Sequence, residues 1–422
     1  MREFLKERLP LTEFSEHLRK PLPKHINLLF SLGSLAMFLL LLQAATGAFL
    51  ALYYSPSPEH AHNAVTYISE EVPFGAFVRG LHHWGASAMV IIVFLHLLRV
   101  VLYGSYKAPR ELTWIFGVLL LLVVLGFGFT GYLLPWDEKA YWATVVGVEI
   151  ASTAPVLGDF VAKVLRGGAE IGAVTLSRFY ALHTIWLPWL AFGLVGVHLF
   201  FVRYYGSSGI PQNTPEEMSS QPIEEGKPFY PHQVFEDMVG MLILFVVLAC
   251  VALFVPVPLE DVADPTNADY DPRPEWYFLF LFQLLKYFQG PLEIIGTFVI
   301  PTVGMVLLLL LPFLDRSERA VLWKRPIALT VTSVSVVAIV GLTILGASSP
   351  KLETQEAPQP TAETKNTVPS DTETEAVEEA EEVFDFQLTE EEIEGTEEAE
   401  EVFDLQLTEE EIEGAREVGE SQ

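Results

Sequence analysis

LHHWGASAMVIIVFLHLLRV occupies residues 81–100 and is the stretch that decides the fold. Apart from three histidines and one arginine the run is apolar, and it is long enough to cross the hydrocarbon core of a bilayer, which takes about 20 residues of helix. Ionisable side chains inside a membrane are costly and usually functional. The stretch therefore predicts a membrane-spanning helix that carries a site built from imidazoles.

Six further apolar runs of similar length predict an all-α, polytopic membrane protein. The seven expected spans cover residues 27–54, 76–103, 112–134, 179–204, 236–257, 289–314 and 326–347. Two long loops, 136–177 and 258–288, carry aromatic and proline-rich stretches. Loops of that length are usually functional, so both are expected to be folded, partly amphipathic surface segments.

The charge of the chain is concentrated at its C-terminal end. The 422 residues are 51% hydrophobic, yet the formal net charge is −29, and residues 351–422 alone hold 26 Asp or Glu and three Lys or Arg. This tail begins with a Pro/Thr/Glu-rich stretch that is expected to be disordered, and it contains two 19-residue repeats that start at Glu378 and Glu397. It is interpreted either as a solvated extension or as docking motifs for a basic partner such as a c-type cytochrome.

Cysteine content and loop charge limit the location and chemistry. Cys250 is the single cysteine, which excludes an intrachain disulfide, a Cys-ligated iron–sulfur cluster and CxxCH haem attachment. Residues 1–25 carry charges of both signs without an apolar core, so no signal peptide is expected there. Lys and Arg gather in the loops that lie on the same side of the membrane as the N-terminus. This charge bias predicts a multi-pass protein of the cell (inner) membrane whose N-terminus is cytoplasmic. Seven spans then place the acidic tail outside.

Four histidines mark two of the predicted helices, His82 and His96 on the second and His183 and His198 on the fourth. A spacing of 14 residues returns to within about 40° of one helix face, about 21 Å along the axis, so His82 rather than His83 shares a face with His96. The two helices run parallel, so His82 is expected to face His183 near the outer side and His96 to face His198 nearer the inside. Two imidazole pairs at two depths are typical of two bis-histidine haems.

Glycines with the same spacing support this interpretation. A flat macrocycle needs close backbone approach, and glycine permits it; ordinary small-residue helix packing is the alternative. The four are Gly33 and Gly47 on the first helix and Gly117 and Gly131 on the third.

Three arginines near the histidines, Arg79, Arg99 and Arg178, are predicted to pair with haem propionates; the alternative is that they snorkel to the interface. The histidines also have other interpretations. Each could be an ordinary buried histidine, and a pair could bind a divalent metal ion. However, imidazoles about 20 Å apart along one helix cannot share one ion.

Four motifs complete the pattern: RGLHHWGAS from Arg79, GYLLPWDEKAYW from Gly131, LSRFYALH from Leu176 and PEWY from Pro274. Together they resemble cytochrome b, the membrane subunit of quinol–cytochrome c (or plastocyanin) oxidoreductases, over about residues 20–347. The resemblance implies a four-helix bundle that holds two non-covalent b-type haems, followed by three helices that close the quinone sites. It also implies quinol oxidation at an outer site, electron transfer through both haems to an inner quinone-reducing site, and proton translocation.

In that family PEWY lines the outer site, so the resemblance implies that Glu275 accepts a proton from quinol, with Tyr132 and Tyr277 nearby. A positioned carboxylate is suited to that role. The inner quinone site is expected to contain Asp237, Arg203 and Ser207, which match positions of the family or of its chloroplast-type branch.

Several features resemble the chloroplast-type branch, among them Arg203, the 15-residue ligand spacing on the fourth helix and the seven spans. In that branch the polypeptide is usually split after the fourth helix, whereas both halves are fused here. The branch attaches a third haem through the cysteine of NxxYCLGG. This sequence reads NLLFSLGS, and because the hydroxyl of Ser31 cannot form a thioether, no covalent haem is expected.

The expected domains are a cytoplasmic segment (1–26), a haem-binding domain (27–210), a quinone-site domain with the PEWY loop (211–347) and the acidic tail (348–422). The expected partners are a Rieske iron–sulfur protein, a c-type cytochrome, quinone, the lipid bilayer and, by family, a second copy in a homodimer, but no nucleic acid. Two rival classes remain. A dihaem anchor of an anaerobic dehydrogenase lacks PEWY, and a secondary transporter would show internal repeats and broken helices.

Overall fold

The computed structural model describes residues 21–23, 27–205, 225–267, 270–317 and 325–348. The acidic tail, with its predicted disorder and repeats, lies outside the described residues, as does Ser207 of the predicted inner site.

Seven helical segments among the described residues are long and apolar enough to cross a membrane, which confirms the predicted all-α, multi-pass fold. They are η1–α3 (Leu28–Ser31, Leu32–Ala51), α5 (Gly75–Leu102), α6 (Glu111–Tyr132), α9–η2–α10 (Ala173–Ala181, Leu182–Trp186, Leu187–Tyr205), η3–α12 (Phe229–Gln233, Val234–Phe254), η5–η6–α14 (Gly290–Leu292, Ile295–Val299, Ile300–Leu314) and α15 (Pro326–Ser348). Apolar side chains remain exposed along these helices, as expected where the solvent is a bilayer.

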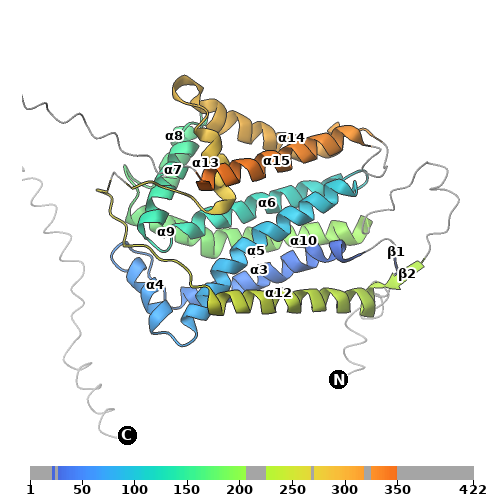
Figure 1. Ribbon diagram of the computed structural model, residues 1–422, viewed down its shortest axis with the longest axis horizontal. Coiled ribbons are helices and arrows are strands. Elements are labelled where there is room, and N and C mark those ends of the chain that lie inside the picture. The colour runs from blue at the N-terminus through green and yellow to red at the C-terminus, as the bar shows by residue number, and fades with distance from the viewer. Residues whose placement is uncertain (1–20, 24–26, 206–224, 268–269, 318–324, 349–422) are drawn as a thin grey trace, which may run out of the picture. The chain divides into compact units, whose positions relative to one another are not determined.

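The connecting segments divide between the two ends of the helices (Figure 1). Short helices gather at one end, here called the outer end: α4 (Ala61–Glu70), α7 (Glu138–Ser152), α8 (Gly158–Arg166), η4 (Trp276–Phe278) and α13 (Leu279–Leu285). At the other, inner end, β1 (Pro21–Pro23) pairs antiparallel with β2 (Glu225–Pro228). The two long loops predicted to be folded therefore contain α7, α8, η4 and α13.

Buried side chains hold the first helices together where the histidines lie. One cluster joins α3, α5 and α12 through Leu39, Leu81, Met89 and Leu248. A second cluster at the outer end packs α7 against α9 and includes Tyr141, Leu176 and Phe179. The helices that carry the candidate site are thus fixed from both sides.

A buried ionic cluster joins the loop after α5 to the loop after α14. Asp315 accepts from Lys107 at 2.9 Å and from the Tyr106 hydroxyl, and the guanidinium of Arg325 lies 3.7 Å from the same carboxylate. Burial alone would raise the pKa of Asp315, but hydrogen bonds from Ser317, Tyr106 and Lys107 more than offset it and hold that pKa well below its usual value. The cluster fastens the second half of the chain to the first.

Candidate functional site

The structure brings His82 and His183 together near the outer end. Their ring centroids lie 6.2 Å apart with an interplanar angle of 72°. His83 instead packs edge-on against Trp84. The outer pair is therefore formed by the residues that the spacing selected.

Two threonines fix the orientation of the outer rings. Nδ1 of His82 lies 2.9 Å from the hydroxyl of Thr46, and Nδ1 of His183 lies 3.1 Å from that of Thr130. Each hydroxyl already donates to a carbonyl one helical turn back, that of Leu42 or Gly126, so it can only accept from the imidazole. Nδ1 then carries the proton, and the Nε2 lone pair of each ring is available for a ligand.

Each predicted glycine lies against one of the four histidines. A Cβ built on Gly131 would meet Cε1 of His183 at 2.4 Å, and one on Gly47 would meet Cε1 of His82 at 3.1 Å. At the inner pair, the corresponding distances are 3.2 Å from Gly33 to His96 and 3.3 Å from Gly117 to His198. The imidazole rings thus occupy the space that the missing side chains leave, which is closer contact than the macrocycle argument required.

The inner pair has a different environment. Nδ1 of His96 and Nδ1 of His198 are both buried without a hydrogen-bond partner among the described residues. The positions equivalent to Thr46 and Thr130, one residue before each inner glycine, are Leu32 and Phe116. No side-chain hydroxyl supports the inner rings from those positions.

A local irregularity explains the spacing of 15 residues on the fourth span. Residues Leu182–Trp186 form one turn of π-helix between α9 and α10. Such a turn absorbs one extra residue, so a 15-residue spacing across it is equivalent to the 14-residue spacing on α5. His183 and His198 therefore share a face as closely as His82 and His96 do.

The three predicted arginines differ in their contacts. Arg79 donates to the Pro258 carbonyl at 2.9 Å and to Ser69 at 3.2 Å, and Arg178 donates to carbonyls of α8. Arg99 lies over the ring of Phe30, 4.2 Å from its centroid, and its buried Nε has no hydrogen-bond partner among the described residues. Arg99 is thus the best placed of the three for an anionic group.

The outer histidine pair fits one of the predicted haems. An imidazole nitrogen binds a metal at about 2.0–2.1 Å, so two rings on opposite sides of one ion have centroids about 6 Å apart, close to the 6.2 Å of the outer pair. In the described part of the chain, no group of three or more His, Cys, Asp or Glu gathers as a metal site. Two protein ligands would leave a metal ion under-coordinated, and the macrocycle of a haem would supply the remaining ligands.

The PEWY segment docks at the outer end against three elements of the first half. Trp276 donates through Nε1 to Ser87 of α5 at 3.2 Å, and the ring of Tyr277 lies where a Cβ on Gly128 of α6 would meet it at 3.0 Å. Glu275 accepts from Lys139 of α7 at 3.0 Å. The structure thus brings Glu275 and Tyr277 together.

Tyr132, the third predicted residue of the quinol site, ends α6 beside them. Its buried hydroxyl has no hydrogen-bond partner among the described residues, and the ammonium of Lys139 lies 5.6 Å from its ring centroid. Burial, with a smaller effect from the charge of Glu275, raises the pKa of Tyr277. The Tyr277 hydroxyl therefore stays protonated at neutral pH and can donate a hydrogen bond.

Asp237 and Arg203, two residues predicted at the inner site, contact different side chains. Asp237 of α12 is buried and accepts from Ser34 at 2.7 Å and from Gln233 at 2.8 Å, and Gln233 also donates to Ser31 at 3.2 Å. Ser34, which donates to this carboxylate, follows Gly33, the glycine that lies against His96. Arg203 lies over the ring of Phe229, 4.1 Å from its centroid.

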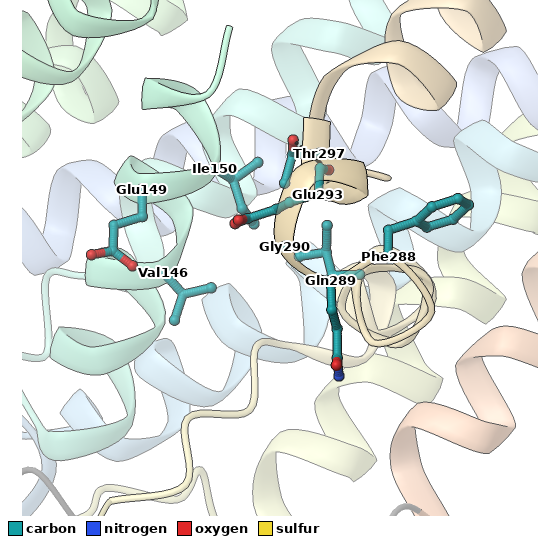
Figure 2. Close-up of a pocket in the computed structure, with 9 residues that line it drawn as sticks. Val146, Glu149, Ile150, Phe288, Gln289, Gly290, Glu293 and Thr297 are labelled. Atoms are coloured by element: carbon teal, nitrogen blue, oxygen red, sulfur yellow. Dashed lines mark hydrogen bonds between the residues drawn. The ribbon is translucent and has the colours of Figure 1, made fainter. Parts of the chain in front are cut away.

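A pocket of about 300 Å³ opens at the outer end between α7 and the start of the sixth span. Figure 2 shows Val146, Glu149 and Ile150 of α7 on one side and Gln289, Gly290, Glu293 and Thr297 on the other. None of the predicted site residues lines it. Glu149 lies ten residues beyond Lys139, about 15 Å along the helix, so the pocket is separate from the Glu275 site.

Sequence reasoning did not assign roles to Thr46, Thr130 or Lys139. The signal for the threonines is the Thr-Gly pair that occurs at 46–47 and again at 130–131, at matching positions of two helices. Lys139 lies inside the GYLLPWDEKAYW motif, and nothing local shows that its partner is 136 residues away.

Two family models match this chain, one in its first half and one in its second half. The family model described as Cytochrome b/b6/petB matches residues 17–206, and the one described as Cytochrome b(C-terminal)/b6/petD matches residues 262–359. A cytochrome bc complex cytochrome b subunit from Chlorobaculum thiosulfatiphilum is 38% identical over 309 residues, which is 73% of this chain and 71% of that protein.

Two further similar proteins match mainly one half. Cytochrome b6 of Heliobacterium mobile is 46% identical over 211 residues, 49% of this chain and 98% of that protein. A menaquinol:cytochrome c reductase cytochrome b subunit of Bacillus subtilis (strain 168) is 44% identical over 219 residues, 49% and 96% of the two chains. Among solved structures, a chain of a hyperthermophilic respiratory Complex III superposes with a TM-score of 0.75 at 29% identity, covering 83% of this chain and 92% of that one.

Proposed function

The chain belongs to the cytochrome b family, and from that premise we propose that it is the membrane subunit that oxidises quinol and returns electrons to quinone in a quinol–cytochrome c oxidoreductase. The names of its relatives support this class of reaction, since one is a menaquinol:cytochrome c reductase subunit. The observation that carries the proposal is the outer pair, two imidazoles 6.2 Å apart whose Nε2 atoms are available to one iron.

Four histidines hold two non-covalent b-type haems in this proposal, His82 with His183 and His96 with His198. When bound, the haems accept and pass on single electrons between the outer and inner ends. The protein contributes the rigid mounting: glycines that admit the rings, threonines that fix the outer tautomer, and Arg99 at a propionate of the inner haem. Arg79 and Arg178 remain candidates for the outer propionates.

Quinol gives up its protons at the outer end, where Glu275 is the acceptor. A general base must reach the proton that it removes and be charged when it does so; Lys139 supplies the counter-charge. Tyr277, which keeps its hydroxyl protonated, and Tyr132 are proposed to orient the quinol oxygen by hydrogen bonding.

The inner end is the proposed quinone-reducing site. Asp237 is buried among neutral donors, and a carboxyl in that setting can pass a proton to a reduced quinone. Arg203 and Ser207 are proposed to line the same site. The proposal includes a Rieske protein and a c-type cytochrome as electron acceptors, a homodimeric complex, proton translocation, and an N-terminus in the cytoplasm with the tail outside.

Haem stoichiometry and ligand variants test this proposal. We expect the purified complex to yield two acid–acetone-extractable b haems per chain by the pyridine haemochrome assay, with no covalent haem left on this polypeptide. His82→Ala should remove one haem, whereas the neighbouring His83→Ala should retain both. Retention of both haems in His82→Ala would contradict the ligand assignment, and a haem that resists extraction would contradict the interpretation of Ser31.

A further inference from the structure

The carboxylate of Glu275 is bonded to a lysine from the other half of the chain. Nζ of Lys139 lies 3.0 Å from Oε1 of Glu275, and the two side chains are 28% and 16% exposed. Neither the family resemblance nor the geometry of the histidines gives Lys139 a role. A lysine that contacts the proposed proton acceptor directly requires an explanation.

The position of Lys139 is fixed by its local structure. It lies in the first turn of α7, whose N-cap Asp137 accepts from the backbone N–H of Ala140 at 2.8 Å. The backbone N–H of Glu138 donates to the carbonyl of Asp261 at 3.0 Å, which ties the start of α7 to the segment that leads to PEWY. The ammonium is therefore presented by a helix start that is held from two sides.

The surroundings make a counter-charge necessary. Glu275 lies among the aromatic rings of its own motif and faces Tyr132 and Tyr277, with His83 of α5 also nearby. A carboxylate with little access to water is costly unless it is paired and hydrogen-bonded. A carboxylic acid that is already protonated cannot take a proton from quinol.

We propose that Lys139 is a positioning residue for quinol oxidation: its ammonium holds Glu275 in place as a carboxylate, ready to accept the quinol proton. The inference rests on the proposed role of Glu275. In the step concerned, the O–H bond of a quinol hydroxyl breaks and a new O–H bond forms on Glu275, while the electrons leave to the acceptors of the proposed reaction. Neutralised Glu275 then no longer attracts Lys139, so the ion pair is strongest before the proton arrives.

The test is a double-mutant cycle in the intact complex. Lys139→Met, Lys139→Arg, Glu275→Gln and the Met/Gln double variant are assayed for quinol-dependent cytochrome c reduction, with kcat and the KM for quinol measured separately. Lys163→Met on α8 is the matched control, since Lys163 is an exposed lysine of the same end.

We expect Lys139→Met to lower kcat by about tenfold or more, which is part of the roughly 10²–10⁴-fold that a general base contributes, with little change in KM. Lys139→Arg should restore most of the rate, and Lys163→Met should leave it unchanged. Lys139→Met should have no further effect once Glu275 is Gln, because the two side chains act as one unit. Haem content should be the same in all variants.

Two results would overturn the inference: a normal kcat in Lys139→Met, or independent, multiplicative losses in the double variant. If Lys139→Met is normal while Glu275→Gln is slow, the proposed function stands and only the role of Lys139 fails. If the wild-type complex does not oxidise quinol, the proposed function itself fails.

Discussion

Gly131→Ala tests the outer haem site most sharply, because the added methyl group has no room. Its Cβ would lie 2.4 Å from Cε1, 2.9 Å from Nδ1 and 3.1 Å from Nε2 of His183. Carbon atoms pack at about 3.5 Å or more, so the ring must move by about 1.1 Å. The displacement must also break the bond between Nδ1 and Thr130, which is 3.1 Å long.

Gly117→Ala is the matched control on the same helix. There the new Cβ would lie 3.3 Å from Cε1 of His198, so a shift of about 0.2 Å suffices. Overpacking costs about 1–3 kcal/mol, roughly 10–100-fold in an equilibrium constant, and this cost falls on the outer haem in Gly131→Ala. We expect about one haem per chain in that variant and two in Gly117→Ala.

The assay is the pyridine haemochrome together with a potentiometric titration that separates the two b haems. In Gly131→Ala the missing component should be the outer haem, while the inner one keeps its potential. The reasoning is refuted if Gly131→Ala retains both haems with unchanged spectra, or if Gly117→Ala loses haem to the same extent.

Three further predictions concern other parts of the chain. Thr46→Val and Thr130→Val each leave an outer imidazole N–H unpaired, which weakens that imidazole as an electron donor to the iron. In a redox titration the potential of the outer haem should therefore rise while that of the inner haem stays constant. Thr46→Ser keeps the hydroxyl and should behave as wild type. Asp315→Asn removes the carboxylate charge that faces buried Lys107 and Arg325, and it should lower the stability of the complex in thermal unfolding by about 3–5 kcal/mol. Because the folded-state pKa of Asp315 is lowered, its contribution is complete above the unfolded pKa of about 4 and is lost as pH falls through the lowered value, so the destabilisation should be equal at pH 6 and pH 8. Truncation after Ser348 should slow cytochrome c reduction at low salt but not at high salt if the acidic tail docks a basic partner, and equal rates at all ionic strengths would contradict docking.

The spans and the histidine faces could be predicted because both depend on short-range rules. A bilayer demands long apolar helices, and the helix repeat determines that His82, not His83, lies on the face of His96. The ends of the spans were less predictable. The fourth starts at Ala173 rather than 179, and the fifth covers Phe229–Phe254 rather than 236–257. Hydropathy does not register the polar first turns, which are nevertheless helical.

Contacts between distant segments were not predictable. The hydroxyl of Thr130 completes a local helical hydrogen bond, and nothing in the sequence shows that it also accepts from His183, 53 residues away. Likewise, Lys139 appears in sequence as one charge in a surface loop. Its contact with Glu275 becomes visible only in the folded structure, which places the two side chains side by side. The glycines were assigned to the haem from their spacing, and the structure adds that each of them lies against one of the four imidazole rings.

The two halves of the chain contribute unequally to the proposed chemistry. The four histidines, their glycines and the two threonines all lie between residues 27 and 205, within the stretch 17–206 that matches the family model described as Cytochrome b/b6/petB. The quinol site, by contrast, needs both halves, since Glu275, Trp276 and Tyr277 gain their contacts from α7, α5 and α6. In the proposed function, haem binding therefore rests on residues of the first half alone, whereas quinol oxidation depends on how closely the second half docks onto it. The buried cluster at Asp315 and the Lys139–Glu275 pair fasten that docking at opposite ends of the bundle, so a change that loosens either should impair quinol turnover before it releases haem.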